Sequence, residues 1–156
     1  MREYLFRGKR KDNGKWVFGG VLPYDDSVSI VAVESFPGYF DPCSGYGEPP
    51  SSELCDYLVD PKTVGQYTMK DDKNGTRIFE GDIISYSVKG WRGTTPVWYS
   101  EDRCGYTTDF CTLNGFDKDE IEVVGNVFDN QDLLEEYQKR CAERLWGDNK
   151  NKDEKY

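Results

Sequence analysis

Short runs of aromatic and β-branched residues, separated by turn residues, make up most of the chain. Between Ile84 and Val88 apolar and polar residues alternate, which is the period of a half-buried β-strand. Further runs with strand character lie at residues 4–7, 15–19, 29–33, 63–68, 97–99, 106–113 and 121–128. Strands that recur about every eight to twelve residues, with Gly or Asn between them, predict an all-β barrel or sandwich.

Several of these predicted strands are separated by glycine-containing turns. Asn13-Gly14 and Asn74-Gly75 each favour a β-hairpin, because both residues of an Asn-Gly pair tolerate positive φ. Gly81-Asp82 supplies another turn. The Asp82 carboxylate is expected to accept hydrogen bonds from nearby backbone N–H groups there, rather than to act as a catalytic base. The pair Gly19-Gly20 indicates a bulge or a close approach of the backbone.

Residues 36–56 interrupt the strand pattern, because four prolines and three glycines fall among them. Proline cannot donate a ladder hydrogen bond and glycine adds an entropic cost, so a long loop is predicted. This loop is either a structural insertion or a binding loop that presents Tyr39, Phe40 and Tyr46. A second loop is predicted at residues 90–95, where Trp91 is expected to be exposed.

Helical periodicity appears only near the C-terminus. One apolar stripe at helical spacing consists of Leu134, Tyr137, Cys141 and Leu145. Asn130 is suited to cap the start of this helix and Gly147 to end it, so a helix over about 130–146 is predicted to pack on the β domain. Residues 148–156 are predicted to form a disordered charged tail. The chain is thus predicted to be one mainly β, barrel-like domain over 1–147, with an N-terminal hairpin and one C-terminal helix.

The charge of the 156-residue chain is unevenly distributed. Its formal net charge is −9, but residues 1–20 hold six basic and two acidic side chains, so this segment carries +4 and the rest −13. The acidic balance argues against a binder of duplex nucleic acid, whose affinity comes mainly from Lys and Arg on phosphates. The basic segment either pairs with the protein's own acidic surface or forms a contact patch for an acidic partner.

The composition also limits the possible chemistry. The chain has no histidine, which removes nucleophile–histidine catalysis and the commonest zinc sites. Five cysteines without a C-x-x-C motif indicate reduced thiols in a cytoplasmic protein, and their spacing does not fit a metal site. No signal-peptide pattern and no stretch long and apolar enough for a membrane helix is present. We therefore predict a protein without enzymatic activity, cofactor or metal.

Three stretches of the sequence resemble one family, in the expected order, at residues 1–19, 59–83 and 122–134. The most specific residues are Val-Gly-Gln-Tyr-Thr at 64–68 and Lys-Asn-Gly followed by Phe-Glu-Gly-Asp-Ile within 73–83. This pattern is similar to that of the YopX family of phage and prophage proteins, although Met69-Lys70 stand where the family usually has Gly-Leu. The resemblance implies a mostly β fold, often barrel-like, and no catalytic residue, because the family has no established activity.

Together these features predict a phage- or prophage-encoded binding protein that contacts a host or phage protein, with homo-oligomerisation left open. The expected binding residues lie in the basic hairpin and among the exposed aromatics: Arg7, Lys9, Arg10, Lys15, Trp16, Tyr39, Tyr46 and Trp91. The alternative is a single-stranded nucleic-acid-binding module in which the same hairpin meets phosphates and exposed aromatic rings stack on bases.

Overall fold

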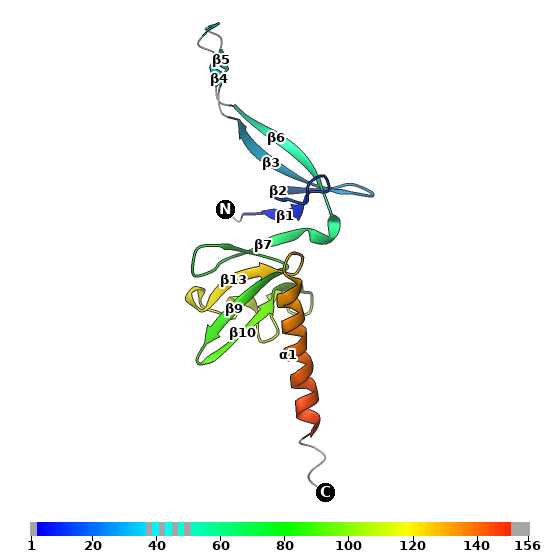
Figure 1. The fold of residues 1–156 in the computed structure, drawn as a ribbon, viewed down its shortest axis with the longest axis vertical. Coiled ribbons are helices and arrows are strands. Elements are labelled where there is room, and N and C mark those ends of the chain that lie inside the picture. The colour runs from blue at the N-terminus through cyan, green and yellow to red at the C-terminus, as the bar shows by residue number, and fades with distance from the viewer. Residues whose placement is uncertain (1–2, 37–38, 41–42, 45–46, 49–50, 151–156) are drawn as a thin grey trace. The chain divides into compact units, whose positions relative to one another are not determined.

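The computed structural model describes residues 3–36, 39–40, 43–44, 47–48 and 51–150 (Figure 1). The chain forms two compact units, Met1–Tyr67 and Thr68–Tyr156. The first unit is built from β1 (Phe6–Lys9), β2 (Trp16–Pro23), β3 (Val28–Phe36), β4 (Tyr39–Phe40), β5 (Gly47–Glu48) and β6 (Ser51–Val59). A short 3-10 helix at Pro61–Thr63 follows, and β7 (Gly65–Asp71) runs across the boundary.

The first unit is an antiparallel sheet in the order β6-β3-β2-β1, and β1 also pairs with the first residues of β7. Its buried core consists of Val17, Ile30 and Val59, which lie on one face of the sheet. Just after β1, Arg10 forms an antiparallel bridge with Val59 at the end of β6, so the sheet curls strongly. The prediction of a mainly β chain with one C-terminal helix is confirmed, but the sheets do not close into a barrel.

The loop predicted over residues 36–56 is shorter than expected. Ser51–Val59 forms β6, which pairs with β3 from Phe36↔Ser51 to Val28↔Val59. The reason is that the prolines and glycines of this segment end at Pro50, so nothing in the following nine residues interrupts a ladder. Within the remainder, β4 and β5 form a short antiparallel pair.

The second unit is organised around β9 (Asp82–Val88), the strand predicted from its alternating pattern. β9 lies between β10 (Trp91–Pro96) and β13 (Ile121–Asn126). The other strands are β8 (Arg77–Phe79), which pairs with β7, and the hairpin of β11 (Trp98–Ser100) and β12 (Gly105–Thr107). Two short 3-10 helices lie at Leu113–Gly115 and Lys118–Glu120. The buried core consists of Ile78, Ile84, Tyr86, Val97, Leu113, Phe116 and Ile121.

Two predicted segments of this unit differ from the structure. Of residues 90–95, predicted as a loop, all but Gly90 are part of β10, because a two-residue turn at Lys89-Gly90 returns the chain directly beside β9. Residues 106–113, predicted as one strand, are extended only as far as Thr107. The chain then turns, since the Thr108 hydroxyl donates to the Cys111 carbonyl at 3.1 Å and Thr107 bridges Thr112.

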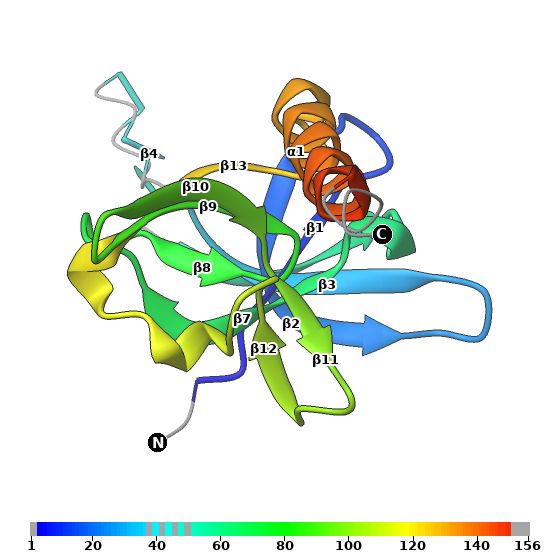
Figure 2. The same ribbon diagram turned by 90° about the horizontal axis from the view of Figure 1, so that it is seen from below.

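The C-terminal helix α1 (Gln131–Lys150) is longer than predicted, because Gly147 lies within it rather than ending it. Glycine costs a helix interior about 1 kcal/mol, which lowers its stability but does not stop the helix. The Asn130 side chain accepts from the Asn126 N–H at 3.1 Å, so it ties α1 back to β13. α1 lies beside β10 (Figure 1). Arg140 of α1 donates to the Thr94 carbonyl of β10 at 3.4 Å, and Figure 2 shows the helix from its C-terminal end. No helix in the described part of the chain is long and apolar enough to cross a membrane.

Candidate functional site

The N-terminal hairpin has a longer connection than the predicted two-residue turn. Gly14 has a φ of +68°, whereas Asn13 does not reach the left-handed region. Asn13 instead accepts the Lys15 N–H through its side chain at 2.9 Å. The Arg10 N–H donates to the Lys15 carbonyl at 2.9 Å, and this bond closes a loop over residues 10–15. The hairpin therefore keeps Lys15 exposed at its tip.

Three of the predicted binding residues form one cation–aromatic cluster on this hairpin. The guanidinium carbon of Arg7 lies 4.7 Å from the centre of the Trp16 ring, and the Lys9 ammonium lies 5.5 Å from it. Arg7 is only 7% exposed. Cations over an aromatic face are attracted to the ring quadrupole, so these side chains stabilise one another. Much of the basic hairpin is therefore engaged within the protein.

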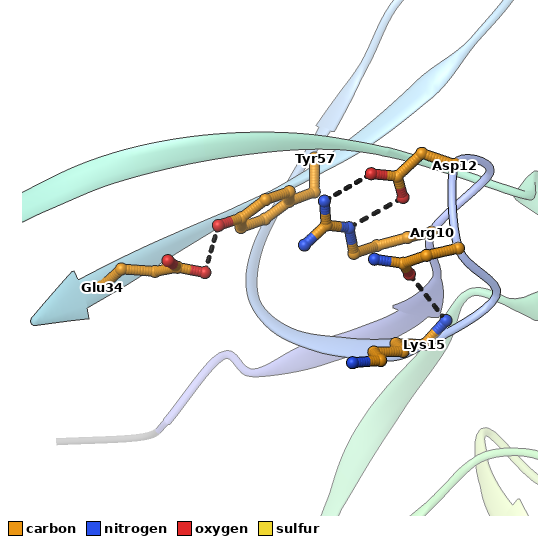
Figure 3. A network of polar contacts seen from close by, with 6 residues as sticks. Arg10, Asp12, Lys15, Glu34 and Tyr57 are labelled. Atoms are coloured by element: carbon orange, nitrogen blue, oxygen red, sulfur yellow. Dashed lines mark hydrogen bonds and ion pairs between the residues drawn. The ribbon is translucent and has the colours of Figure 1, made fainter.

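Arg10, another cation among the predicted binding residues, belongs to a separate network with acidic and aromatic side chains (Figure 3). Its guanidinium lies 4.1 Å from the Tyr57 ring centre and meets Asp12 in two hydrogen bonds, of which the Nε–Oδ1 bond is 2.9 Å. These bonds raise the pKa of Arg10 and lower that of Asp12. The Tyr57 hydroxyl donates to Glu34, which raises the pKa of Tyr57. Arg10 is therefore engaged within the protein, by Asp12 of its own hairpin and by the Tyr57 ring.

The exposed aromatic residue Trp91 lies at a different place, in the second unit. Lys89 and Gly90 have φ values of +46° and +89°, the pattern of a two-residue hairpin turn, and they bring Trp91 directly opposite Val88. Because side chains alternate along a strand, Trp91, Val88 and Tyr86 lie on one face of this hairpin. Trp91 is 73% exposed, which is exceptional for so large an apolar side chain.

Trp91 borders a hollow that we call the apolar pocket, with a volume of about 510 Å³. Its lining residues are Tyr86, Val88, Lys89, Trp91, Phe110, Cys111, Gly115 and Phe116. The Tyr86 ring meets the Phe110 ring edge to face at 4.9 Å and lies 6.0 Å from the Phe116 ring. The strands β9 and β10 thus form one wall, and the turn at residues 108–116 forms the other.

The position of the second wall is fixed by buried contacts. Leu113 is fully buried in the core of the unit, and it holds the turn against β9. The Lys70 ammonium donates to the Phe116 carbonyl. Gly115 comes so close to Cys111 that an added Cβ would lie 3.1 Å from its Sγ atom. The pocket is therefore formed by packed segments on both sides.

The lining of the pocket is mostly apolar and aromatic. It contains four aromatic rings but no carboxylate, and Lys89 is the one charged residue among its lining residues. Among the described residues, no group of three or more side chains could hold a metal ion. The pocket is suited to an apolar or aromatic group, with a cation at its rim.

The predicted turn residues Asn74, Gly75, Gly81 and Asp82 lie at turns and shape the backbone there. Gly75 and Gly81 have φ values of +80° and +84°. Asn74 donates its backbone N–H to the Asp72 carboxylate, and the buried Asp82 carboxylate accepts the Phe79 N–H at 2.7 Å. Tyr46 lies outside the described residues, as does the Tyr39 side chain, so the binding role predicted for both stays a prediction.

Trp91 is among the residues predicted from the sequence, but the residues that build its pocket are not. Tyr86 is predicted as a strand residue, and nothing in the local pattern places it against a turn 24 residues away. Phe110 is assigned to a long strand that the structure replaces with a turn. The signal available in the sequence is Asn114-Gly115, a turn pair beside two phenylalanines.

Comparison with known proteins places the chain in a family. The family model described as YopX protein matches residues 5–135, which is most of the chain. No curated protein matches it. The crystal structure of protein EF1440 from Enterococcus faecalis is similar, with 22% sequence identity, a TM-score of 0.49, and coverage of 86% of this chain and 99% of that one. With the family model matched over both units, the chain belongs to the YopX family.

Proposed function

We propose that the protein acts by binding another protein, which inserts an apolar side chain into the apolar pocket. The observation that supports this most is the exposure of two pocket aromatics, 73% for Trp91 and 45% for Phe110. Exposed tryptophan beside a preformed apolar hollow is typical of the central residues of protein interfaces, where a few anchors carry most of the binding energy.

The charge at the pocket limits the chemistry of the partner. Lys89 stands at the rim, exposed, and no acidic residue lines the pocket. A partner segment with an aromatic or aliphatic anchor and a neighbouring Asp or Glu would satisfy both features, because opposite charges at an interface rim guide association and orientation. Consistent with the expected phage or prophage origin, we propose a host or phage protein in the bacterial cytoplasm as this partner.

The nucleic-acid alternative has less support from the geometry. Trp16, the tryptophan of the basic hairpin, already holds Arg7 and Lys9 over its ring. Trp91 remains exposed near two cations, but Arg92 pairs with Ser87 and therefore lies on the other face of the β9–β10 hairpin. A strand of nucleic acid would need ring and cations on one surface. Binding of single-stranded nucleic acid is therefore one of the outcomes that the experiment below distinguishes.

The proposal predicts that a Trp91→Ala variant loses partner binding. Peptides selected from a random library on the wild-type protein should carry an apolar anchor next to Asp or Glu. Their affinity, measured by fluorescence anisotropy, should fall roughly 30-fold on Trp91→Ala, the loss of about 2 kcal/mol expected for an interface anchor. Because Trp91 is exposed, its removal should leave the thermal unfolding temperature nearly unchanged.

Trp98→Ala is the matched control, since Trp98 is a partly exposed tryptophan of the same unit that does not line the pocket. Peptide binding should survive this change. Selected peptides that bind both variants equally, or no selected peptides at all, would contradict a protein-binding pocket. Binding of a fluorescent oligothymidylate that weakens steeply with salt and requires Trp91 would replace the proposal with the nucleic-acid alternative.

A further inference from the structure

The sheet of the first unit has an open edge along its last strand, β6, to which another strand could pair. β6 is the last strand of its sheet, and in the described part of the chain nothing pairs with its outer edge between Ser51 and Tyr57. Beyond that segment the edge is covered, because the Lys11 N–H donates to the Leu58 carbonyl at 3.0 Å. An open edge of seven residues without proline offers backbone donors and acceptors to another strand.

The direction of these backbone groups follows from that covering bond. Since the Leu58 carbonyl points to Lys11, it points away from β3, and along a strand alternate residues direct their N–H and C=O groups to the same side. Asp56 and Leu54 therefore present both groups outward. Leu54 lies at the middle of the open segment, so an antiparallel strand centred on it can use the whole edge.

The side chains at this edge continue an apolar row. Val33 pairs directly with Leu54, and their side chains are 67% and 74% exposed. On the opposite face of the sheet, Glu34 faces Glu53, and this pair of like charges is unfavourable for an isolated ribbon. Any strand added to the edge would extend the Val33–Leu54 row on one side and lie beside Glu53 on the other.

We propose that β6 pairs antiparallel with β6 of a second copy of this chain, around a two-fold axis at Leu54. In this register the two Leu54 side chains meet, so the apolar row runs from Val33 through both leucines to Val33 of the second copy. Glu53 lies opposite Cys55 of the second copy rather than opposite a carboxylate. The two sheets join into one, in an interface that uses the same surface on both copies.

Neighbouring registers are less favourable for physical reasons. A two-fold axis at Glu53 brings two carboxylates directly opposite each other. An axis at Asp56 does the same, and it also requires the Leu58 edge that Lys11 occupies. An axis at Cys55 places Leu54 opposite Asp56 and interrupts the apolar row. A second copy therefore fits the edge best when Leu54 of one copy lies opposite Leu54 of the other.

Proline at the centre of the edge should block this association. Because the Leu54 N–H points outward, Leu54→Pro removes a donor that the β3 ladder does not use, and proline is tolerated at such edge positions. Sedimentation velocity on the full chain should show a concentration-dependent dimer for the wild type and a monomer for Leu54→Pro. The control, Leu54→Ala, keeps the N–H and should still dimerise, roughly tenfold more weakly because it loses an apolar contact.

Disulfide trapping tests the register without relying on proline. In a Leu54-centred pair, residues 53 and 55 of opposite copies form a non-hydrogen-bonded pair with Cα atoms about 4.5 Å apart, within disulfide range. Glu53→Cys, in a background with Cys43→Ser and Cys104→Ser, should therefore give a covalent dimer with Cys55 on oxidation. Adding Cys55→Ser should abolish it.

Several results would overturn the proposal. A wild-type chain that is monomeric at millimolar concentration has no such interface, and a dimer that persists in a folded Leu54→Pro variant uses another surface. A covalent dimer that survives Cys55→Ser places the two-fold axis at Glu53. Because the apolar pocket lies in the other unit, Trp91→Ala should leave the dimer intact, so this inference and the proposed partner binding are tested separately.

Discussion

Replacing Gly19 with alanine should destabilise the first unit by about 3 kcal/mol or more, which is the upper end of the cost of overpacking. A Cβ atom at this position would lie 1.9 Å from the Val31 carbonyl oxygen and 2.7 Å from the carbonyl carbon. Backbone atoms of a central strand cannot move aside as a flexible side chain can. β2 and β3 would have to separate, with loss of ladder hydrogen bonds where Gly20 pairs with Val31. Urea unfolding monitored by circular dichroism measures the free energy of unfolding.

The adjacent glycine provides a matched control for this clash. A Cβ atom at Gly20 meets nothing within 4 Å, and neither glycine has a positive φ. Gly20→Ala should therefore change the free energy of unfolding by no more than about 0.5 kcal/mol, as exposed substitutions usually do. Equal losses in the two variants would show that β3 does not approach Gly19 in the way the structure describes.

This pair of glycines also shows what a local sequence pattern does not predict. The Gly19-Gly20 sequence predicts a bulge or a close backbone approach, and the approach is present. Which of the two glycines needs to be glycine depends on Val31, a residue of another strand. Local pattern carries no information on that distance. The same limit explains β6, whose residues follow a proline-rich segment and acquire strand structure by pairing with β3.

In the candidate sites too, some features follow from the local sequence and others depend on segments that are distant in the chain. Strand β9 follows from the alternation within Ile84–Val88, and the exposure of Trp91 follows from its place in the sequence. The apolar pocket does not follow from the sequence, because its second wall depends on the turn at residues 108–116. The basic hairpin is visible as a charge run, but two of the side chains that engage its cations are aromatic: Trp16 nearby in the hairpin, and Tyr57 on a strand far along the sequence. Charge counts do not detect cation–π pairing.

Replacing Asp72 with alanine should have a second large effect, a loss of about 3–5 kcal/mol in the free energy of unfolding. Asp72 is 1% exposed, and its carboxylate accepts three backbone N–H groups. Those of Asn74 and Thr76 lie 2.8 Å from Oδ1, and that of Val123 lies 3.0 Å from Oδ2. One side chain thus joins the turn after β7 to β13, and its removal leaves three donors without an acceptor. Thermal and urea unfolding both report this loss.

Asp72→Asn isolates the contribution of the second oxygen. The amide keeps the shape of the carboxylate but has one acceptor oxygen, so at least one backbone donor faces an NH₂ group. The expected loss is intermediate between wild type and Asp72→Ala. Asp119→Asn, the same substitution at an exposed aspartate of the second unit, should be nearly neutral. An Asp72→Asn variant as stable as wild type would mean that the carboxylate does not hold the turn.

The pH dependence of stability gives an independent measure of the same interaction. Burial raises the pKa of Asp72, but the N–H groups of Val123, Thr76 and Asn74 together outweigh it and hold that pKa below its ordinary value. The folded state therefore releases this proton more readily than the unfolded state, whose Asp pKa is about 3.9. The stabilisation is present above that value and is lost as the pH falls through the lower pKa of the folded state. Because other carboxylates titrate in the same range, the informative quantity is the difference between wild type and Asp72→Asn. That difference should shrink as the pH falls below about 4, and two parallel curves would contradict the assignment.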